Sequence, residues 1–416
     1  MGIFVHVLSS RNIMKYTLMN AEHEVLEFET DDKGSINIIR TLDEFDYAPL
    51  HFSRHAQDMQ MLNIDLISFL RSRTINSARN DAKDIFAAAG VNDHIELSLR
   101  SLGLSLTDHY WYRPSGSELK WKDIGCFDRE YDTSFGEAIL RRDYAALAKA
   151  DPYTPDCTLG GISKKAWIRI DGLPMLLKSE AGTSKFIEQS DLLSARLTEK
   201  LLDKDDYVRY TRCEFAGESY IACRGMVRSG EEFVPASDIL TMIGNHSANT
   251  FKYISKDNDL LNRFTESLEK AGIENIKAYY AKLAAVFNLS LAGDCHLNNF
   301  GFIRDLKTMK LKAAPLFDRG RSFGSFGEPI ENGRYSCAEY AIESTKTVFI
   351  MMLFHSTLIH KDWDFGWYDP KRLDGFEDEI ENMLSICDDI PKQYIEMLKA
   401  AFQYQLDYLN KAADII

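Results

Sequence analysis

The sequence has little of what marks secreted, membrane-spanning or thiolate-metal proteins. Its seven cysteines are odd in number and far apart, and no two of them form a C-x-x-C pair, which argues against a disulfide framework and a thiolate zinc site. No stretch approaches the about 18 consecutive apolar residues of a membrane-spanning helix; the longest run is 348–354. The N-terminal residues lack the basic region and cleavage site of a secretory signal. Together these absences predict a cytoplasmic protein without a membrane span.

Basic residues are also fewer than acidic ones. The 416 residues contain 49 Lys and Arg against 63 Asp and Glu, which gives a formal net charge of −14. Proteins dedicated to nucleic acids usually present a basic face that replaces the counterions of the phosphates. We therefore expect no direct nucleic-acid binding. With only 10 prolines and 24 glycines but 45% apolar residues, the chain is not linker-like and can build a large core.

The hydrophobic pattern changes along the chain and predicts an α+β protein with two lobes. Short strand-like stretches lie at residues 3–7 and 25–28, and helical spacing follows between residues 50 and 90, ended by Gly90. Strands are expected at 166–170, 174–178, 207–212 and 218–226. Residues beyond 236 are mostly helical, except for a hairpin between residues 299 and 318. We predict an N-terminal accessory region (1–95), a strand-rich lobe (96–230) and a helical lobe (231–416).

A glycine-containing segment, T-L-G-G-I-S-K-K at residues 158–165, precedes the first strand of a predicted β-hairpin whose turn is Asp171-Gly172. Glycine lets a backbone approach phosphates closely and exposes N–H donors. The segment is neither G-x-G-x-x-G nor a P-loop. The candidate phosphate-binding residues in it are Thr158, Gly160, Gly161, Ser163 and Lys165.

A lysine ends the second strand of this hairpin, in M-L-L-K. The ammonium of Lys178 could reach the α- and β-phosphates of a nucleotide, and a carboxylate on the helix expected at 185–202 could orient it. Asp191 and Glu188 are the two candidates. The sequence leaves the choice between them open.

The sharpest local signal is L-A-G-D-C-H-L-N-N-F-G-F at residues 291–302, followed by P-L-F-D, which ends at Asp318. An aspartate at position 294 could accept a proton from a hydroxyl group. The oxygens of Asn299 and Asp318 suit magnesium, since hard cations prefer oxygen ligands. The hairpin between them would bring Asn299 and Asp318 together.

In this order, the glycine turn, strand lysine, helix acid, G-D-x-H-x-x-N and P-L-F-D resemble the HipA-like serine/threonine kinases, which include toxin kinases of bacterial toxin–antitoxin systems. The resemblance covers about residues 100–360 and includes L-S-L-T-D-H-Y-W at residues 104–111. It implies a bilobal protein-kinase-like fold with an additional mixed α/β region at the N-terminus. The magnesium motif departs from the Asp-Phe-Gly of protein kinases, because Arg319 and Gly320 follow Asp318.

The resemblance also implies roles for individual residues. Asp294 would be the catalytic base. His296, the second catalytic candidate, could by its chemistry act as a base or a metal ligand, but we favour a role in bracing the catalytic loop through hydrogen bonds. Lys178, Asp191 and the glycine turn would hold the phosphates of ATP, and the adenine would lie near residues 223–226, from Cys223 to Met226. Asn299 and Asp318 would bind Mg²⁺. The implied substrate is a protein with an acceptor Ser or Thr, and an antitoxin is the implied partner.

Two other functions stay open. Small-molecule kinases of the aminoglycoside or choline kinase type share the pattern from Gly293 to Asn299, but their magnesium aspartate commonly lies in an I-D-W/F-E context, so P-L-F-D favours the HipA-like interpretation. A nucleotide-binding scaffold without catalysis is the second. The joint presence of Lys178, Asp294, Asn299 and Asp318 argues against it.

Overall fold

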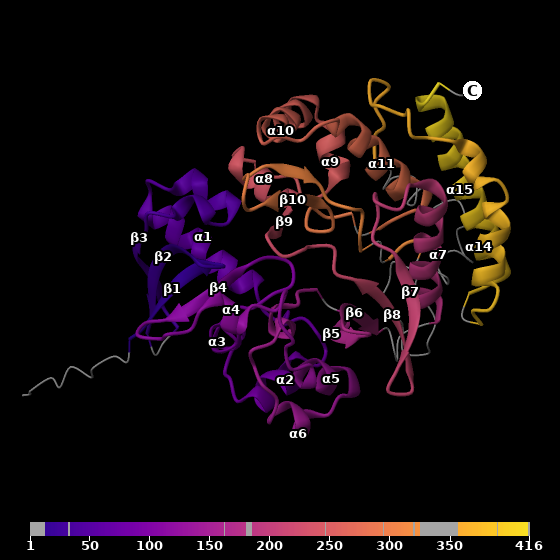
Figure 1. The fold of residues 1–416 in the computed structure, drawn as a ribbon. Helices are drawn as coiled ribbons and strands as arrows, with labels where there is room; N and C mark the ends of the chain where they lie inside the picture. Colours follow the sequence, from indigo (N-terminus) through magenta and orange to yellow (C-terminus); the bar gives the residue numbers. More distant parts are fainter. Residues whose placement is uncertain are drawn as a thin grey trace, which may run out of the picture. The chain divides into compact units, whose positions relative to one another are not determined.

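The computed structural model describes residues 13–31, 34–161, 163–179, 185–245, 247–293, 295–318, 321–324, 357–388 and 390–414. The chain divides into two compact units, Met1–Ile162 and Ser163–Ile416, and each combines sheets with helices (Figure 1). The predicted α+β class is therefore confirmed. We predicted three regions with boundaries at 95/96 and 230/231, which differ from the boundary between these two units. That division into three regions stays a prediction.

The first unit is built on an antiparallel sheet of order β3-β2-β1-β4. Its strands are β1 (Met14–Asn20), β2 (His23–Thr30), β3 (Ile36–Thr41) and β4 (Tyr110–Pro114). The strand expected at 25–28 is confirmed as part of β2, while residues 3–7 lie outside the described residues. Because β4 pairs with β1, residues on both sides of position 95 share one sheet.

Helices complete the first unit: η1 (Phe45–Tyr47), η2 (Leu50–His55), α1 (Met59–Ser72), α2 (Ala82–Ala89), α3 (His94–Arg100), α4 (Trp121–Ile124), α5 (Ser134–Arg141), α6 (Tyr144–Leu147) and η3 (Pro155–Thr158). Helix α1 buries Leu62, Leu66 and Phe69 in the same apolar cluster as the sheet residues. Gly90 ends α2 in the left-handed conformation, as its position in the sequence predicted.

The second unit begins with a sheet of order β5-β6-β8-β7. It comprises β5 (Lys164–Ile170), β6 (Leu173–Ser179), β7 (Tyr210–Phe215) and β8 (Glu218–Arg224), and helix α7 (Lys185–Leu201) connects β6 to β7. Asp171 and Gly172 both have positive φ, which is the geometry of a two-residue hairpin turn. The strand expected from residue 207 begins later, at Tyr210, because Tyr207 bridges instead to Leu316.

A smaller sheet of order β11-β10-β9 follows, made of β9 (Glu231–Pro235), β10 (Gly301–Asp305) and β11 (Leu311–Ala313). The hairpin predicted between residues 299 and 318 is confirmed as β10–β11, and β9 was not predicted. Around it lie α8 (Ala236–Met242), α9 (Phe251–Lys256), α10 (Asn258–Lys270) and α11 (Ile276–Leu289). The chain continues with η4 (Pro370–Leu373), α14 (Phe376–Leu384) and α15 (Lys392–Ala412).

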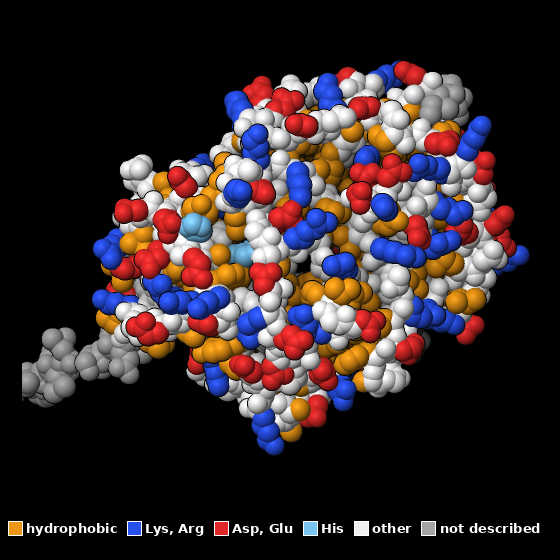
Figure 2. All heavy atoms as spheres, in the orientation of Figure 1, with side chains coloured by type: hydrophobic (Ala, Val, Ile, Leu, Met, Phe, Trp, Pro, Cys, Tyr) orange, Lys and Arg blue, Asp and Glu red, His pale blue; other side chains and the backbone are white. Residues whose placement is uncertain are grey.

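Helix α7 contacts both β7 and α14, and α11 contacts α15 (Figure 1). Among the helices in the described ranges, none is long and apolar enough to cross a membrane; the apolar run at 348–354 lies outside those ranges. On the face shown in Figure 2, acidic and basic side chains are interspersed over the surface of each unit.

Candidate functional site

A partly buried ion pair joins the first sheet of the second unit to helix α7. Lys178, near the end of β6, donates from Nζ to Oδ2 of Asp191 at 3.0 Å, and the two side chains are 17% and 9% exposed. Of the two acids that the sequence left open, Asp191 is therefore the one beside Lys178. Glu188 instead accepts a hydrogen bond from Arg212 at 2.7 Å.

A second carboxylate reaches the same ammonium. Asp318 Oδ1 lies 3.8 Å from Lys178 Nζ, and its side chain is 39% exposed. The backbone N–H of Asp318 donates to the hydroxyl of Tyr210 at 2.9 Å. The fold thus brings together three residues that the sequence analysis selected from distant segments: a strand lysine, a helix aspartate and the aspartate of P-L-F-D.

Strand register extends this cluster across the sheet. Lys165 pairs with Lys178, and Lys178 pairs with Ile221. Cys223 comes two residues after Ile221, and its side chain therefore lies on the same face of the sheet, because side chains alternate along a strand. The face that carries Lys178 therefore also carries Lys165 and Cys223, two of the predicted nucleotide-contacting residues. Met226 follows β8 and is partly buried.

Burial raises the pKa of the Cys223 thiol to about 12, and the carboxylate of Asp318 acts in the same direction. A hydrogen bond from Tyr210 and the charges of Lys165 and Lys178 act against this shift. Cys223 is therefore a protonated, weakly nucleophilic thiol at neutral pH. Its surroundings are the same charged groups that form the Lys178 cluster.

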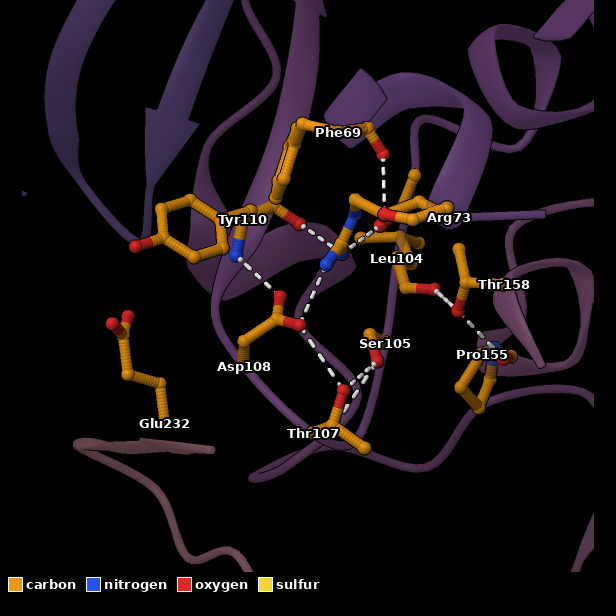
Figure 3. Close-up of polar contacts among 12 residues, drawn as sticks. Phe69, Arg73, Leu104, Ser105, Thr107, Asp108, Tyr110, Pro155, Thr158 and Glu232 are labelled. Atoms are coloured by element: carbon orange, nitrogen blue, oxygen red, sulfur yellow. Dashed lines mark hydrogen bonds and ion pairs between the residues drawn. The ribbon is translucent and has the colours of Figure 1, made fainter. Parts of the chain in front are cut away.

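The glycine turn is divided by the boundary between the units. Thr158 ends η3 in the first unit, and its hydroxyl lies within hydrogen-bond distance of the carbonyl of Leu104 at 2.8 Å and that of Pro155 at 3.1 Å (Figure 3). Gly160 and Gly161 follow in exposed positions, and Gly161 has a φ of 83°. Ser163 and Lys165 belong to the second unit. Phosphate binding by this turn stays a prediction.

The predicted catalytic loop is described on both sides of Asp294, which itself lies outside the described residues. His296 Nδ1 accepts the backbone N–H of Asn298 at 3.2 Å, and the N–H of Asn299 donates to the His296 carbonyl at 2.9 Å. Gly293 donates to the carbonyl of Arg321 at 3.0 Å. These contacts tie the loop to itself and to the segment after Asp318, which is the kind of contact that a bracing role for His296 requires.

Asn299 and Asp318 flank one end of the β10–β11 hairpin. Phe302 pairs with Ala313, and the N–H of Ala314 donates to the carbonyl of Gly301, so the paired segment continues toward the end where both residues lie. A Cβ at Gly301 would collide with the carbonyl oxygen of Val234 on β9, so the pairing of β10 with β9 needs glycine there. Asn299 is buried.

The oxygen atoms of Asn299 and Asp318 fit magnesium, which usually takes one or two protein oxygens and completes its shell with phosphates and water. Within the described ranges, no group of three or more His, Cys, Asp or Glu side chains could hold a metal ion. The donor set suits an ion that arrives with a nucleotide. Metal binding by these residues stays a prediction.

The segment 104–111, which contributed to the resemblance, holds a buried network in the first unit. Arg73 donates to Asp108 at 2.6 Å and to the carbonyl oxygen of Tyr110 at 3.2 Å. The hydroxyl of Thr107 donates to the same carboxylate at 3.1 Å. Figure 3 shows Asp108 pointing toward Arg73. This part of the motif therefore stabilises the first unit.

Tyr210 is the residue that sequence reasoning missed. Its hydroxyl contacts the backbone of Asp318, which is far away along the chain. The only signal in the sequence was the strand expected at 207–212. A strand pattern does not reveal which loop a tyrosine hydroxyl will meet.

The comparisons with known proteins find similarity at the level of structure. No model of a known protein family and no curated protein matches the chain. A chain of the Shewanella oneidensis MR-1 toxin–antitoxin complex of HipA, HipB and operator DNA is similar over 96% of this chain and 99% of its own length, with 10% identity and a TM-score of 0.50. The Helicobacter pylori proinflammatory kinase CtkA is similar over 62% of this chain and 94% of its own, with 12% identity and a TM-score of 0.42.

The Shewanella similarity spans nearly the whole chain. It confirms the HipA-like, protein-kinase-like fold that the motifs predicted. At 10% identity it concerns the fold alone, because one fold can carry many activities.

Proposed function

We propose that this chain is an ATP- and Mg²⁺-dependent phosphotransferase of the HipA-like type, which transfers the γ-phosphate to a Ser or Thr of a protein. One observation carries the proposal. The ammonium of Lys178 lies 3.0 Å from Asp191 and 3.8 Å from Asp318 in a kinase-like fold. A lysine held by a helix acid, beside an aspartate in the magnesium position, is the arrangement that phosphoryl transfer uses.

Each residue then has a physical task. Lys178 contacts the α- and β-phosphates, and Asp191 holds its ammonium in place. Asn299 and Asp318 hold Mg²⁺, which supplies positive charge beside the phosphates when it is bound. Asp294 orients the acceptor hydroxyl and takes its proton, and His296 braces the loop that carries it. Catalysis is then mostly positioning and charge stabilisation.

The remaining predicted residues surround the nucleotide. The backbone from residue 223 to residue 226 contacts the adenine, and Gly160, Gly161, Ser163 and Lys165 contact the phosphates. The hydroxyl proton of Thr158 is directed to backbone carbonyls, so we assign Thr158 to shaping the turn. Phosphate oxygens accept hydrogen bonds, and a hydroxyl that donates elsewhere has no proton left for them.

Phosphoryl transfer from γ-labelled ATP tests the proposal. The full chain is incubated with Mg²⁺ and cell lysate, beside Asp294→Ala and Asp318→Ala. We expect a labelled protein band that disappears in both variants. Intact ATP binding without any labelled protein would support the scaffold function instead, and ATP consumption only with a metabolite pool would support the small-molecule kinase.

We also propose an antitoxin-type protein partner and a toxin role. The support is the Shewanella chain, which comes from a complex of HipA, HipB and operator DNA. Expression of the chain alone should slow growth, and Asp318→Ala should relieve the effect. Normal growth with active, soluble protein would contradict the toxin role.

A further inference from the structure

The segment that ends at Asp318 pairs with residues 206–208, which directly precede β7. Tyr207 and Leu316 form a parallel bridge. The N–H of Val208 donates to the carbonyl of Leu316 at 2.9 Å, and the N–H of Leu316 donates to the carbonyl of Asp206 at 2.8 Å. Two backbone hydrogen bonds thus hold the chain just before the aspartate.

Asp318 itself has an uncommon backbone. Its φ is 44°, in the left-handed region that residues other than glycine adopt only occasionally. Such a conformation persists only where the surrounding structure holds it. The hydroxyl oxygen of Tyr210 contacts the Asp318 amide, at 2.9 Å from the backbone nitrogen.

Tyr210 is in turn fixed to the sheet. It pairs with Cys223 across β7 and β8, so its ring lies on the face of the sheet that carries Lys178 and Cys223. A phenolic oxygen accepts the Asp318 N–H through a lone pair. The hydroxyl therefore connects a paired strand to the backbone of the predicted magnesium ligand.

We propose that Tyr210 is a positioning residue that holds the Asp318 backbone so that its carboxylate stays beside Lys178, ready to bind Mg²⁺ with a nucleotide. The inference rests on the proposed function. Tyr210 acts through Asp318 and does not take part in the chemistry. The resemblance to HipA-like kinases assigned no role to this residue.

Tyr210→Phe isolates the hydroxyl. The Tyr210 ring is half-buried and lines a pocket of about 210 Å³ together with Leu192, Tyr207 and Met383. Phenylalanine preserves that ring and removes only the oxygen that contacts Asp318. Tyr253→Phe is the matched control, because Tyr253 is exposed on α9, outside the cluster.

The experiment measures nucleotide binding by the full chain, using the non-hydrolysable analogue AMP-PNP in calorimetric titrations with and without Mg²⁺. We expect Tyr210→Phe to keep the Mg²⁺-free affinity and to need roughly fivefold more Mg²⁺ for half-maximal enhancement, which is the loss expected for one hydrogen bond. Tyr253→Phe should match the wild type. A purely structural tyrosine would weaken both affinities together or neither.

Two results separate the hypotheses. If the wild type binds Mg²⁺–nucleotide and Tyr210→Phe shows the same Mg²⁺ requirement, the role of Tyr210 is overturned while the proposed function stands. If the wild type binds no nucleotide, the proposed function fails and the inference fails with it.

Hydrogen exchange keeps the inference testable if the variant does not fold. In the wild type, the Asp318 amide should exchange as slowly as the amides of Val208 and Leu316, because its acceptor is a hydroxyl fixed to the sheet. Fast exchange at Asp318 alone would overturn the positioning role.

Discussion

The pair of Arg73 and Asp108 in the first unit and the pair of Lys178 and Asp191 in the second each join one cation to one carboxylate, and the two pairs differ in their surroundings. In the first unit, Arg73 and Asp108 have side chains that are 8% and 9% exposed. Arg73 also donates to the carbonyl of Gly103, and its guanidinium lies over the rings of Phe69 and Tyr110. In the second unit, Lys178 lies between Asp191 and a more exposed second carboxylate, Asp318.

The difference indicates that the Arg73 pair stabilises the fold, whereas the Lys178 cluster is placed to bind a ligand. The two terminal nitrogens of the Arg73 guanidinium donate to three protein acceptors, Asp108 and the carbonyls of Gly103 and Tyr110, which partly compensate for the loss of hydration. Burial by itself lowers the pKa of Arg73, but Asp108 and nearby groups more than reverse the effect, so the pKa is raised. The Lys178 cluster instead carries a carboxylate that faces solvent, where a ligand can meet it.

The largest loss of stability should come from breaking the buried pair of Arg73 and Asp108. Arg73→Met leaves the carboxylate of Asp108 buried without its cation, which should reduce the free energy of unfolding by about 3–5 kcal/mol. Urea unfolding measures the change. Arg212→Met is the control, since its pair with Glu188 is exposed and should be worth less than about 1 kcal/mol. Equal losses in both variants would contradict the distinction.

The next effect should appear in activity rather than stability. Asp318→Asn keeps the shape of the side chain and removes the negative charge, and phosphoryl transfer should fall by about 10²- to 10³-fold. The initial rate of label transfer measures the loss, and urea unfolding should show little change because Asp318 is partly exposed. A variant that unfolds easily but transfers phosphate normally would reverse our assignment of the two pairs.

Asp191→Asn should have a smaller effect, concentrated in nucleotide binding. Loss of a charge-assisted hydrogen bond to Lys178 should raise the KM for ATP about tenfold. Glu188→Gln is the matched substitution on the same helix, and it should leave the KM unchanged because Glu188 contacts Arg212. A larger change in Glu188→Gln would show that the wrong acid was assigned.

Alkaline pH should reveal a difference in stability between the protein with its buried thiols and variants in which alanine replaces one of them. Burial raises the folded-state pKa of Cys223 to about 12 and also raises that of Cys157 in the first unit. The unfolded state releases the thiol proton first, so stability is fully present below pH 8 and falls as the pH rises toward 12. The slope should be on the order of 1.4 kcal/mol per pH unit for each thiol.

Urea unfolding between pH 8 and pH 11 measures this slope. Cys223→Ala and Cys157→Ala should each flatten the pH dependence. Cys213→Ala should change it less, because this thiol is only partly buried. An unchanged slope in Cys223→Ala would show that the thiol is more accessible to water than the structure indicates.

Much of the site could be predicted because its signals are local. The hairpin around Asp171-Gly172, the lysine at its end and the hairpin from residue 299 to residue 318 are each encoded in short runs of sequence, where period, turn residues and glycine coincide. β9 was missed because a short strand at the start of a helical region has little pattern of its own. The partner of β2 was also missed: β1 begins at Met14, after the residues that we expected to pair.

The sequence by itself determined which residue types are present and in what order: a glycine turn, a strand lysine, a helix acid and two loop motifs. Only the tertiary structure decided which acid meets Lys178, because Asp191 and Glu188 share a helix and differ only in the direction of their side chains. It also decided that a hydroxyl from β7 holds the backbone of Asp318. Contacts between distant segments depend on packing and strand register, which no local pattern encodes.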